Sequence, residues 1–210
     1  MTFGAIKARI ADELVRPDLT DQIALAVNDA IKEAATYRFW FNEVRGLTFP
    51  MVADQSLYDE SDLADIAYIS RIDVLWITVN GQRRNLELRN NLQVNGWLEG
   101  QTDLSGEPAY YARSGNGLQF YMPPNEAYTV TIDGTTRFAE LAADEDENPY
   151  LTEGEKYIRA LAKAQILENV VRGDSLQEAD RQWALAERER RILIGETSGR
   201  VSVGSNMAFL

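Results

Sequence analysis

The stretch DQIALAVNDAIKEAATYRFWFNE, residues 21–43, decides the fold. Its apolar residues recur every three or four positions, which predicts a helix over residues 21–41 with one buried flank. Thr20 precedes the stretch, where an N-cap hydroxyl is expected. The consecutive aromatic residues 39–41 cannot share one helical face, so part of this triplet must anchor the helix end against a segment from elsewhere in the chain. The predicted buried flank contains Ile23, Val27, Ala30, Ile31, Ala34, Tyr37, Trp40 and Phe41.

Three further helices are expected outward from this one. Residues 1–15 show amphipathic spacing and are closed by Pro17. Helical periodicity returns at Thr152, where Thr152 and Glu155 have the spacing of a capping box, and continues to about residue 172. A second capping box at residues 175–178 opens a final helix, for which Gly195 is the expected C-terminal cap.

The middle of the chain has the pattern of strands and tight turns. Asn80-Gly81 between two apolar runs is the strongest short signal for a hairpin with a type I′ turn. A second hairpin is indicated by residues 110–112 and 118–121 around Ser114-Gly115-Asn116-Gly117, and residues 128–132 alternate as a last strand. This region therefore reads as a small antiparallel β unit inserted between helices.

The predicted fold class is α+β: an antiparallel helical bundle of two N-terminal and two C-terminal helices, with the β unit inserted and a flexible C-terminal arm. The expected parts are the N-terminal helices over 1–45, the β-rich insertion over 46–151, the C-terminal helices over 152–195 and the arm over 196–210. The arm is rich in Gly and Ser but ends in apolar residues, so it is expected either to dock on a partner or simply to fray.

The composition limits the chemistry. The 210 residues include neither cysteine nor histidine, which excludes disulfides, thiolate and imidazole metal sites, and nucleophile systems that need a histidine base. We therefore expect no enzymatic activity and no cofactor. No apolar run reaches the roughly 18 residues of a membrane span, and no signal segment opens the chain, so a soluble protein is expected.

The net charge is −12, and residues 46–151 carry most of it, with 17 acidic and 6 basic side chains. An acidic surface repels phosphate, so a nucleic-acid grip is not expected. Two interpretations stay open: an acidic face that maintains solubility, or an acidic face with a function.

Other candidate sites are weak. The acidic run at residues 144–147 lacks the spacing of a calcium loop and is expected to be a solvated linker. A glycosidase-type carboxylate pair has possible members in Asp73, Glu87 and Asp133, but nothing singles out a pair. Aromatic residues of the β unit form either a sugar-stacking platform or part of the core, and the core is favoured. These aromatic residues are Trp76, Trp97, Tyr110, Tyr111 and Tyr121.

Several pieces, in this order, resemble one known family. They are RFWFNE at 38–43, DQSLY at 54–58, GEPAYY at 106–111 and PPNEAY at 123–128, followed by two C-terminal helices. This order and spacing resembles the head-to-tail adaptor (connector) proteins of tailed bacteriophages. The likeness runs from about residue 21 to about residue 186.

The resemblance implies a structural virion protein made in the host cytoplasm. It implies a ring of about twelve copies under the portal protein, closed by a repeated head-to-tail interface and joined to a tail or nozzle protein. DNA would pass through the ring without specific binding, and no membrane is involved. A portal-binding arm is implied with apolar contacts at Val201, Val203, Met207, Phe209 and Leu210. The alternatives are another neck or tail component, a carbohydrate-binding tail module, or a carboxylate enzyme.

Overall fold

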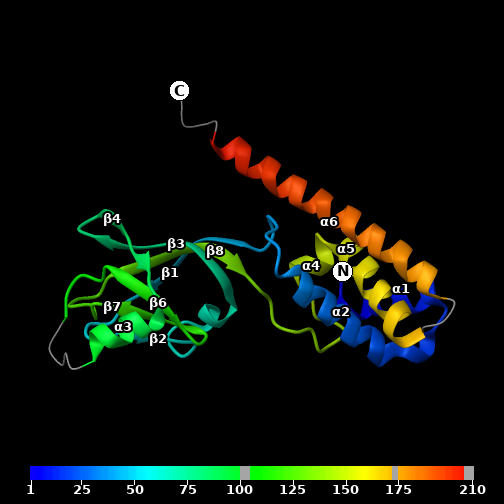
Figure 1. The fold of residues 1–210 in the computed structure, drawn as a ribbon, viewed down its shortest axis with the longest axis horizontal. Helices are drawn as coiled ribbons and strands as arrows, with labels where there is room; N and C mark the ends of the chain where they lie inside the picture. Colours follow the sequence, from blue (N-terminus) through cyan, green and yellow to red (C-terminus); the bar gives the residue numbers. More distant parts are fainter. Residues whose placement is uncertain (100–104, 172–174, 206–210) are drawn as a thin grey trace. The chain divides into compact units, whose positions relative to one another are not determined.

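The computed structural model describes residues 1–99, 105–171 and 175–205, with the backbone alone for residues 201–205 (Figure 1). The chain is an α+β protein and divides into two compact units. The helical unit comprises Met1–Asn42 and Phe138–Leu210, and the β unit comprises Glu43–Arg137. No helix in the described part of the chain combines the length and apolar character that crossing a membrane requires.

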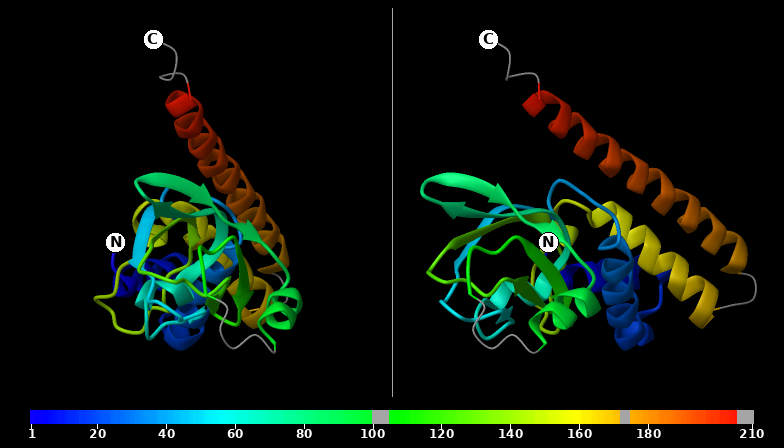
Figure 2. Two further views of the ribbon diagram at one scale, coloured as in Figure 1. Left: turned by 90° about the vertical axis from the view of Figure 1, so that its left-hand side faces the viewer. Right: turned by 60° about the vertical axis from the view of Figure 1, so that its left-hand side comes forward.

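In the helical unit, α5 lies between α2 and α6 and packs against both, while α1 packs against α2 and α5 (Figure 1 and Figure 2). The apolar spacing predicted for residues 21–34 is buried as expected, with Ile23, Val27, Ala30 and Ala34 fully covered. The elements are α1 (Phe3–Leu14), a 3-10 turn (Pro17–Leu19), α2 (Thr20–Ala34), α4 (Pro149–Thr152), α5 (Glu155–Ile166), a π-helical turn (Leu167–Val171) and α6 (Leu176–Ser205).

α2 ends at Ala34, seven residues before the predicted end. The residues that follow form a turn held by the buried side chain of Asn42. Its Oδ1 accepts a hydrogen bond from the Phe39 N–H (2.8 Å), and its Nδ2 donates to the Tyr37 carbonyl (3.0 Å) and to the Tyr150 hydroxyl (2.9 Å). These bonds satisfy a non-helical backbone and place Phe39 in the core, so the aromatic triplet anchors this turn and not a helix end.

Two predicted N-caps are wrong. The Thr20 hydroxyl donates to the Pro17 carbonyl instead of accepting from the first turn of α2. Thr152 is the last residue of α4, where its hydroxyl approaches carbonyls of the preceding turn, and α5 begins only at Glu155. The side-chain cap lies at the start of α4, where Asn148 Oδ1 accepts a hydrogen bond from the Leu151 N–H (3.1 Å). Pro149 occupies the first helical position, where no N–H donor is needed.

Gly195 does not end the last helix. α6 continues through Ser205, so residues 196–205 are helical and are not the flexible arm that the sequence indicated. A glycine inside a helix costs about 1 kcal/mol relative to alanine. Burial on both sides of it offsets this cost, since Leu193 is 8% exposed and Thr197 is 7% exposed.

The β unit contains two four-stranded sheets with strand orders β1-β8-β3-β4 and β2-β7-β6-β5. Both predicted hairpins are present, and Asn80 and Gly81 have φ of 50° and 75°, as a type I′ turn requires. The pairing is antiparallel except between β5 and β6, so the prediction of a purely antiparallel unit is wrong for that pair. The elements are β1 (Glu43–Pro50), β2 (Leu57–Tyr58), a 3-10 turn (Ala64–Tyr68), β3 (Ile69–Val79), β4 (Gln82–Asn85), β5 (Glu87–Leu88), α3 (Asn91–Leu98), β6 (Tyr110–Ser114), β7 (Gly117–Tyr121) and β8 (Thr129–Thr136).

One buried cluster fills the β unit. It draws on strands of both sheets, including Phe49 of β1, Ile77 of β3, Phe120 of β7 and Ile132 of β8. Gly134 of β8 is required by close approach, because a Cβ there would lie 2.0 Å from the Arg71 carbonyl oxygen of β3.

The β unit is shorter than the insertion over 46–151 that the sequence indicated. Residues 138–151 belong with the helices, because Leu141 joins the helical core and its backbone N–H and C=O both bind the Asn28 amide. The acidic run is also tied to the helices, since Lys7 pairs with Asp144 (2.6 Å) and the N–H of Phe3 donates to the Asp146 carbonyl. The charge is therefore shared equally: the β unit holds 13 acidic and 7 basic residues, which is −6 of the −12.

Candidate functional site

The base of the predicted arm is fixed to the turn that follows α2. The backbone N–H of Trp40 donates to Thr197 Oγ1 (3.0 Å), and that hydroxyl donates to the Leu193 carbonyl one turn earlier in α6 (2.8 Å). The Arg200 guanidinium lies 3.6 Å from the centroid of the Trp40 ring, in cation–π geometry. We call these contacts of Trp40 with Thr197 and Arg200 the α6 anchor.

A second cation–π contact supports the same half of α6. The Arg190 guanidinium lies 4.5 Å from the centroid of the Tyr37 ring and also pairs with Glu187 (2.6 Å). The hydrogen bond with Glu187 raises the pKa of Arg190, which therefore remains charged. Two turns of α6 are thus held, through Arg190 and through Arg200, against the turn at residues 35–42, which we call the aromatic turn.

The aromatic turn is itself rigidly packed. Phe39 stacks on Phe41 with centroids 5.3 Å apart, and Phe41 meets the edge of Tyr150 at 5.2 Å. Burial raises the pKa of Tyr150 to about 12, although its hydrogen bond from Asn42 acts in the other direction. Because this turn is part of the helical core, α6 has a fixed direction as far as Arg200.

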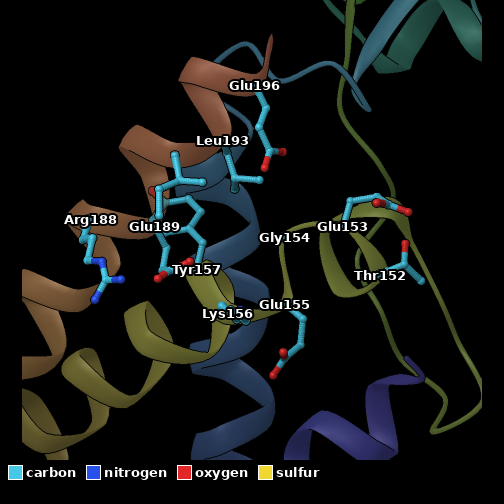
Figure 3. A pocket seen from close by; sticks show the side chains of 11 residues that line it. Thr152, Glu153, Gly154, Glu155, Lys156, Tyr157, Arg188, Glu189, Leu193 and Glu196 are labelled. Atoms are coloured by element: carbon cyan, nitrogen blue, oxygen red, sulfur yellow. The ribbon is translucent and has the colours of Figure 1, made fainter. Parts of the chain in front are cut away.

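A groove of about 340 Å³ lies between the α4–α5 junction and α6. Figure 3 shows Glu153 and Glu155 on one wall and Glu189 and Glu196 on the other. Its lining also includes Tyr157, Leu193 and the half-exposed Ile192, with Lys156 and Arg188. Within the described residues no group of three or more acidic side chains is placed to hold a metal ion.

The five predicted arm residues divide into two groups. Val201 and Val203 lie in the last turns of α6, directly after the α6 anchor, and their side chains are outside the description. Met207, Phe209 and Leu210 lie outside the described residues. The portal contacts assigned to these five residues remain a prediction.

The aromatic residues considered for sugar stacking are engaged in internal contacts. Trp97 packs against Tyr110 and Tyr121, with centroids 5.4 and 5.0 Å away. Tyr111 is buried in the core of the β unit. The Trp76 ring is covered by the Arg83 guanidinium at 3.8 Å, and the Arg89 guanidinium lies 4.9 Å from the Tyr110 centroid. These contacts occupy ring surfaces that a sugar would need.

The three acids considered as catalytic candidates have different partners. Asp73 pairs with Arg71 (2.8 Å), Glu87 pairs with Arg89, and Asp133 accepts a hydrogen bond from the Gly46 N–H (2.7 Å). Each of the three carboxylates is therefore bound to a partner of its own.

The α6 anchor was only partly visible in the sequence. The aromatic triplet indicated an anchoring role, but its partner, Thr197, lies 157 residues away in a Gly- and Ser-rich segment without apolar periodicity. No local signal distinguishes this threonine from its polar neighbours.

A family model described as SU10 adaptor protein matches residues 1–205. The chain belongs to the SU10 adaptor protein family. This family consists of phage structural adaptors, so the chain is a structural component of a phage virion that associates with other head or tail proteins. No protein with a curated description matches it.

Membership agrees with the resemblance to phage head-to-tail adaptors at the level of the family. It covers both units of the adaptor, and it includes α6 through its last described residue, Ser205. The part of the chain that carries the α6 anchor is therefore within the matched region.

Proposed function

We propose that this adaptor forms a ring of about twelve copies that docks beneath the portal protein and joins the capsid to the tail, with a repeated heterologous interface closing the ring. The tail or nozzle protein binds the opposite side, and DNA passes through the ring. This role requires no catalytic centre and no cofactor. Membership of the SU10 adaptor family is the observation that supports it most strongly.

The portal contact is assigned to the end of α6 and the segment after it. The α6 anchor fixes the helix as far as Arg200, so residues 201–205 start from a rigid base. A binding element that is already oriented loses less conformational entropy on docking than a free chain end does. The apolar residues Val201, Val203, Met207, Phe209 and Leu210 then supply the buried contact area.

The charge supports passage of DNA. Both units carry a net charge of −6, so neither offers a cationic surface overall. A channel wall with negative charge repels phosphates and removes binding sites along the path.

Truncation after Arg200 tests the proposal. This variant lacks residues 201–210 but keeps Trp40, Thr197 and Arg200, so the thermal unfolding midpoint should stay within about 2 °C of that of the full chain. We expect co-sedimentation with purified portal rings to be lost. A truncated adaptor that still binds the portal with full affinity refutes the assignment of the contact to this segment.

A matched control replaces Val15 by Ser. Val15 is an exposed apolar residue (81%) that follows α1 and is not part of the α6 anchor. Its loss should leave portal binding unchanged, which separates a specific effect of the arm from a general effect of removing apolar surface.

A further inference from the structure

α6 exposes an apolar stripe that the bundle does not use. Leu185 (37% exposed) and Ile192 (43% exposed) are seven residues apart and therefore lie on one side of the helix. Arg188 lies between them and Arg181 one turn before Leu185. Arg188 is exposed and forms no ion pair or hydrogen bond with any side chain in the described ranges. We call these four residues the α6 stripe.

A second apolar surface lies on the other flank of α5. A groove of about 230 Å³ between α2 and the end of α5 is floored by Ile166 and bordered by Leu25 (66% exposed) and Val170 (42% exposed). Two exposed carboxylates accompany Leu25 on α2: Asp21 precedes it by four residues, and Asp29 follows it by four. Both carboxylates therefore lie beside Leu25 on the same helical face. We call this surface the α2 groove.

The two surfaces point in different directions. Lys156 of α5 borders the side of the α6 stripe, and Gln165 of α5 borders the α2 groove. These residues are nine positions apart, which corresponds to about two and a half turns, so they face opposite sides of α5. A ring needs this property, because a heterologous interface joins two different surfaces of identical subunits.

We propose that the α6 stripe of one copy seats in the α2 groove of the next copy, with Arg188 facing Asp29. This inference rests on the ring of the proposed function and assigns its subunit interface.

Apolar character and charge select a second copy as the occupant. The stripe presents aliphatic side chains with Arg181 and Arg188 along one border and Glu189 along the other. The groove presents aliphatic side chains with Asp21 and Asp29 beside Leu25, so the arginine border of the stripe is the one that complements it. Asp29 is paired only loosely with Lys32 (3.8 Å), and that lysine has a closer partner in Glu140 (2.6 Å). Asp29 is therefore available to Arg188. Opposite charges at matching positions also orient the two helices and suppress like-with-like contacts.

Charge reversal tests the interface without altering the core. Arg188→Glu and Asp29→Arg each place like charges at the contact, and we expect the concentration for half-maximal ring formation on purified portal to rise by about tenfold or more. Native mass spectrometry measures this assembly. Asp12→Arg is the control, since Asp12 is exposed on α1 and belongs to neither the α6 stripe nor the α2 groove, and its assembly should match the wild type.

Recovery of ring assembly in a double variant tests whether Arg188 and Asp29 contact each other. The double variant Arg188→Glu/Asp29→Arg should recover assembly, because each contact again joins opposite charges. An equimolar mixture of the two single variants should also assemble, into rings in which the variants alternate. Each single variant should keep the wild-type thermal unfolding midpoint, because both side chains are exposed.

The outcomes separate this inference from the proposed function. If wild-type rings form on the portal and both single variants form them equally well, the interface is wrong and the ring stands. Loss in the single variants without recovery in the double variant or the mixture also refutes the pairing of Arg188 with Asp29. A wild-type adaptor that stays monomeric with portal present refutes the ring, and the interface with it.

Discussion

Replacing Thr197 by Val should loosen the end of α6 without unfolding the helical unit. Valine keeps the shape and β-branching of threonine but cannot accept the hydrogen bond from the backbone N–H of Trp40 (3.0 Å) or donate to the Leu193 carbonyl. Thr197 is 7% exposed, so the Trp40 N–H loses its partner in a region with little access to water. Loss of one such bond costs about 1–2 kcal/mol.

This cost falls on local opening, because the last turns of a helix can separate without the core unfolding. A change of about 1–2 kcal/mol corresponds to a roughly 5- to 30-fold larger population of the open state. We therefore expect amide hydrogen exchange over residues 198–205 to accelerate by that factor. Hydrogen–deuterium exchange read by mass spectrometry on peptides of this region is the assay.

Ser198→Ala is the matched control. The Ser198 hydroxyl also donates to a carbonyl one turn earlier, that of Ile194 (3.0 Å), but it is exposed and makes no bond to the aromatic turn. Its exchange should change less than about twofold. Equal acceleration in both variants, or none in Thr197→Val, would show that the bond from Trp40 does not hold α6.

Three further changes test the interior of each unit and its ion pairs. Asn42→Ala should lower the free energy of unfolding by about 3 kcal/mol in urea titrations, because it leaves buried partners such as the Tyr150 hydroxyl unsatisfied; a loss below 1 kcal/mol would contradict this. Burial tends to raise the pKa of Glu13, but the hydrogen bond and charge of its lysine and arginine partners lower it overall. The stability that Glu13 contributes is therefore fully present above a pH of about 4.3 and is lost as pH falls through the lowered pKa. Glu13→Gln should flatten this loss, and an unchanged pH profile of the melting temperature would count against it. Gly134→Ala should prevent folding of the β unit, as followed by near-ultraviolet circular dichroism, whereas Gly96→Ala, which meets open space, should be tolerated.

The sequence predicted correctly those elements that depend on residues close together along the chain. The Asn80-Gly81 turn needs positive φ at two adjacent residues, and the sequence places there the two residue types that adopt it most readily. The buried flank of α2 follows in the same way from apolar spacing within fifteen residues.

Predictions failed where the cause lies far along the chain. The aromatic triplet continues the helical spacing of α2, but Asn42 ends that pattern through a hydrogen bond to Tyr150, 108 residues away. Gly195 has the local character of a cap, but α6 continues past it because Thr197 binds Trp40. Likewise the assignment of residues 138–151 depends on where Leu141 packs, which periodicity does not reveal.

For the candidate site, too, the sequence predicted the features set by neighbouring residues and missed those set by residues far apart along the chain. The sequence indicated apolar residues at the C-terminus and an anchoring role for the aromatic triplet, and its absence of histidine and cysteine excluded catalytic sites that need either residue. It did not indicate that Trp40 holds the base of the arm, or that Arg188 and Asp29 lie beside apolar surfaces on opposite sides of α5. Both facts depend on which helices are neighbours.

Electron cryo-microscopy of the adaptor mixed with the portal protein of its own virion tests the central claim most directly. The account predicts a closed ring of about twelve adaptor copies on one end of the portal, with the end of α6 and the segment after it against portal density. Portal particles without a ring, or a ring held to the portal through the β unit alone, would contradict it.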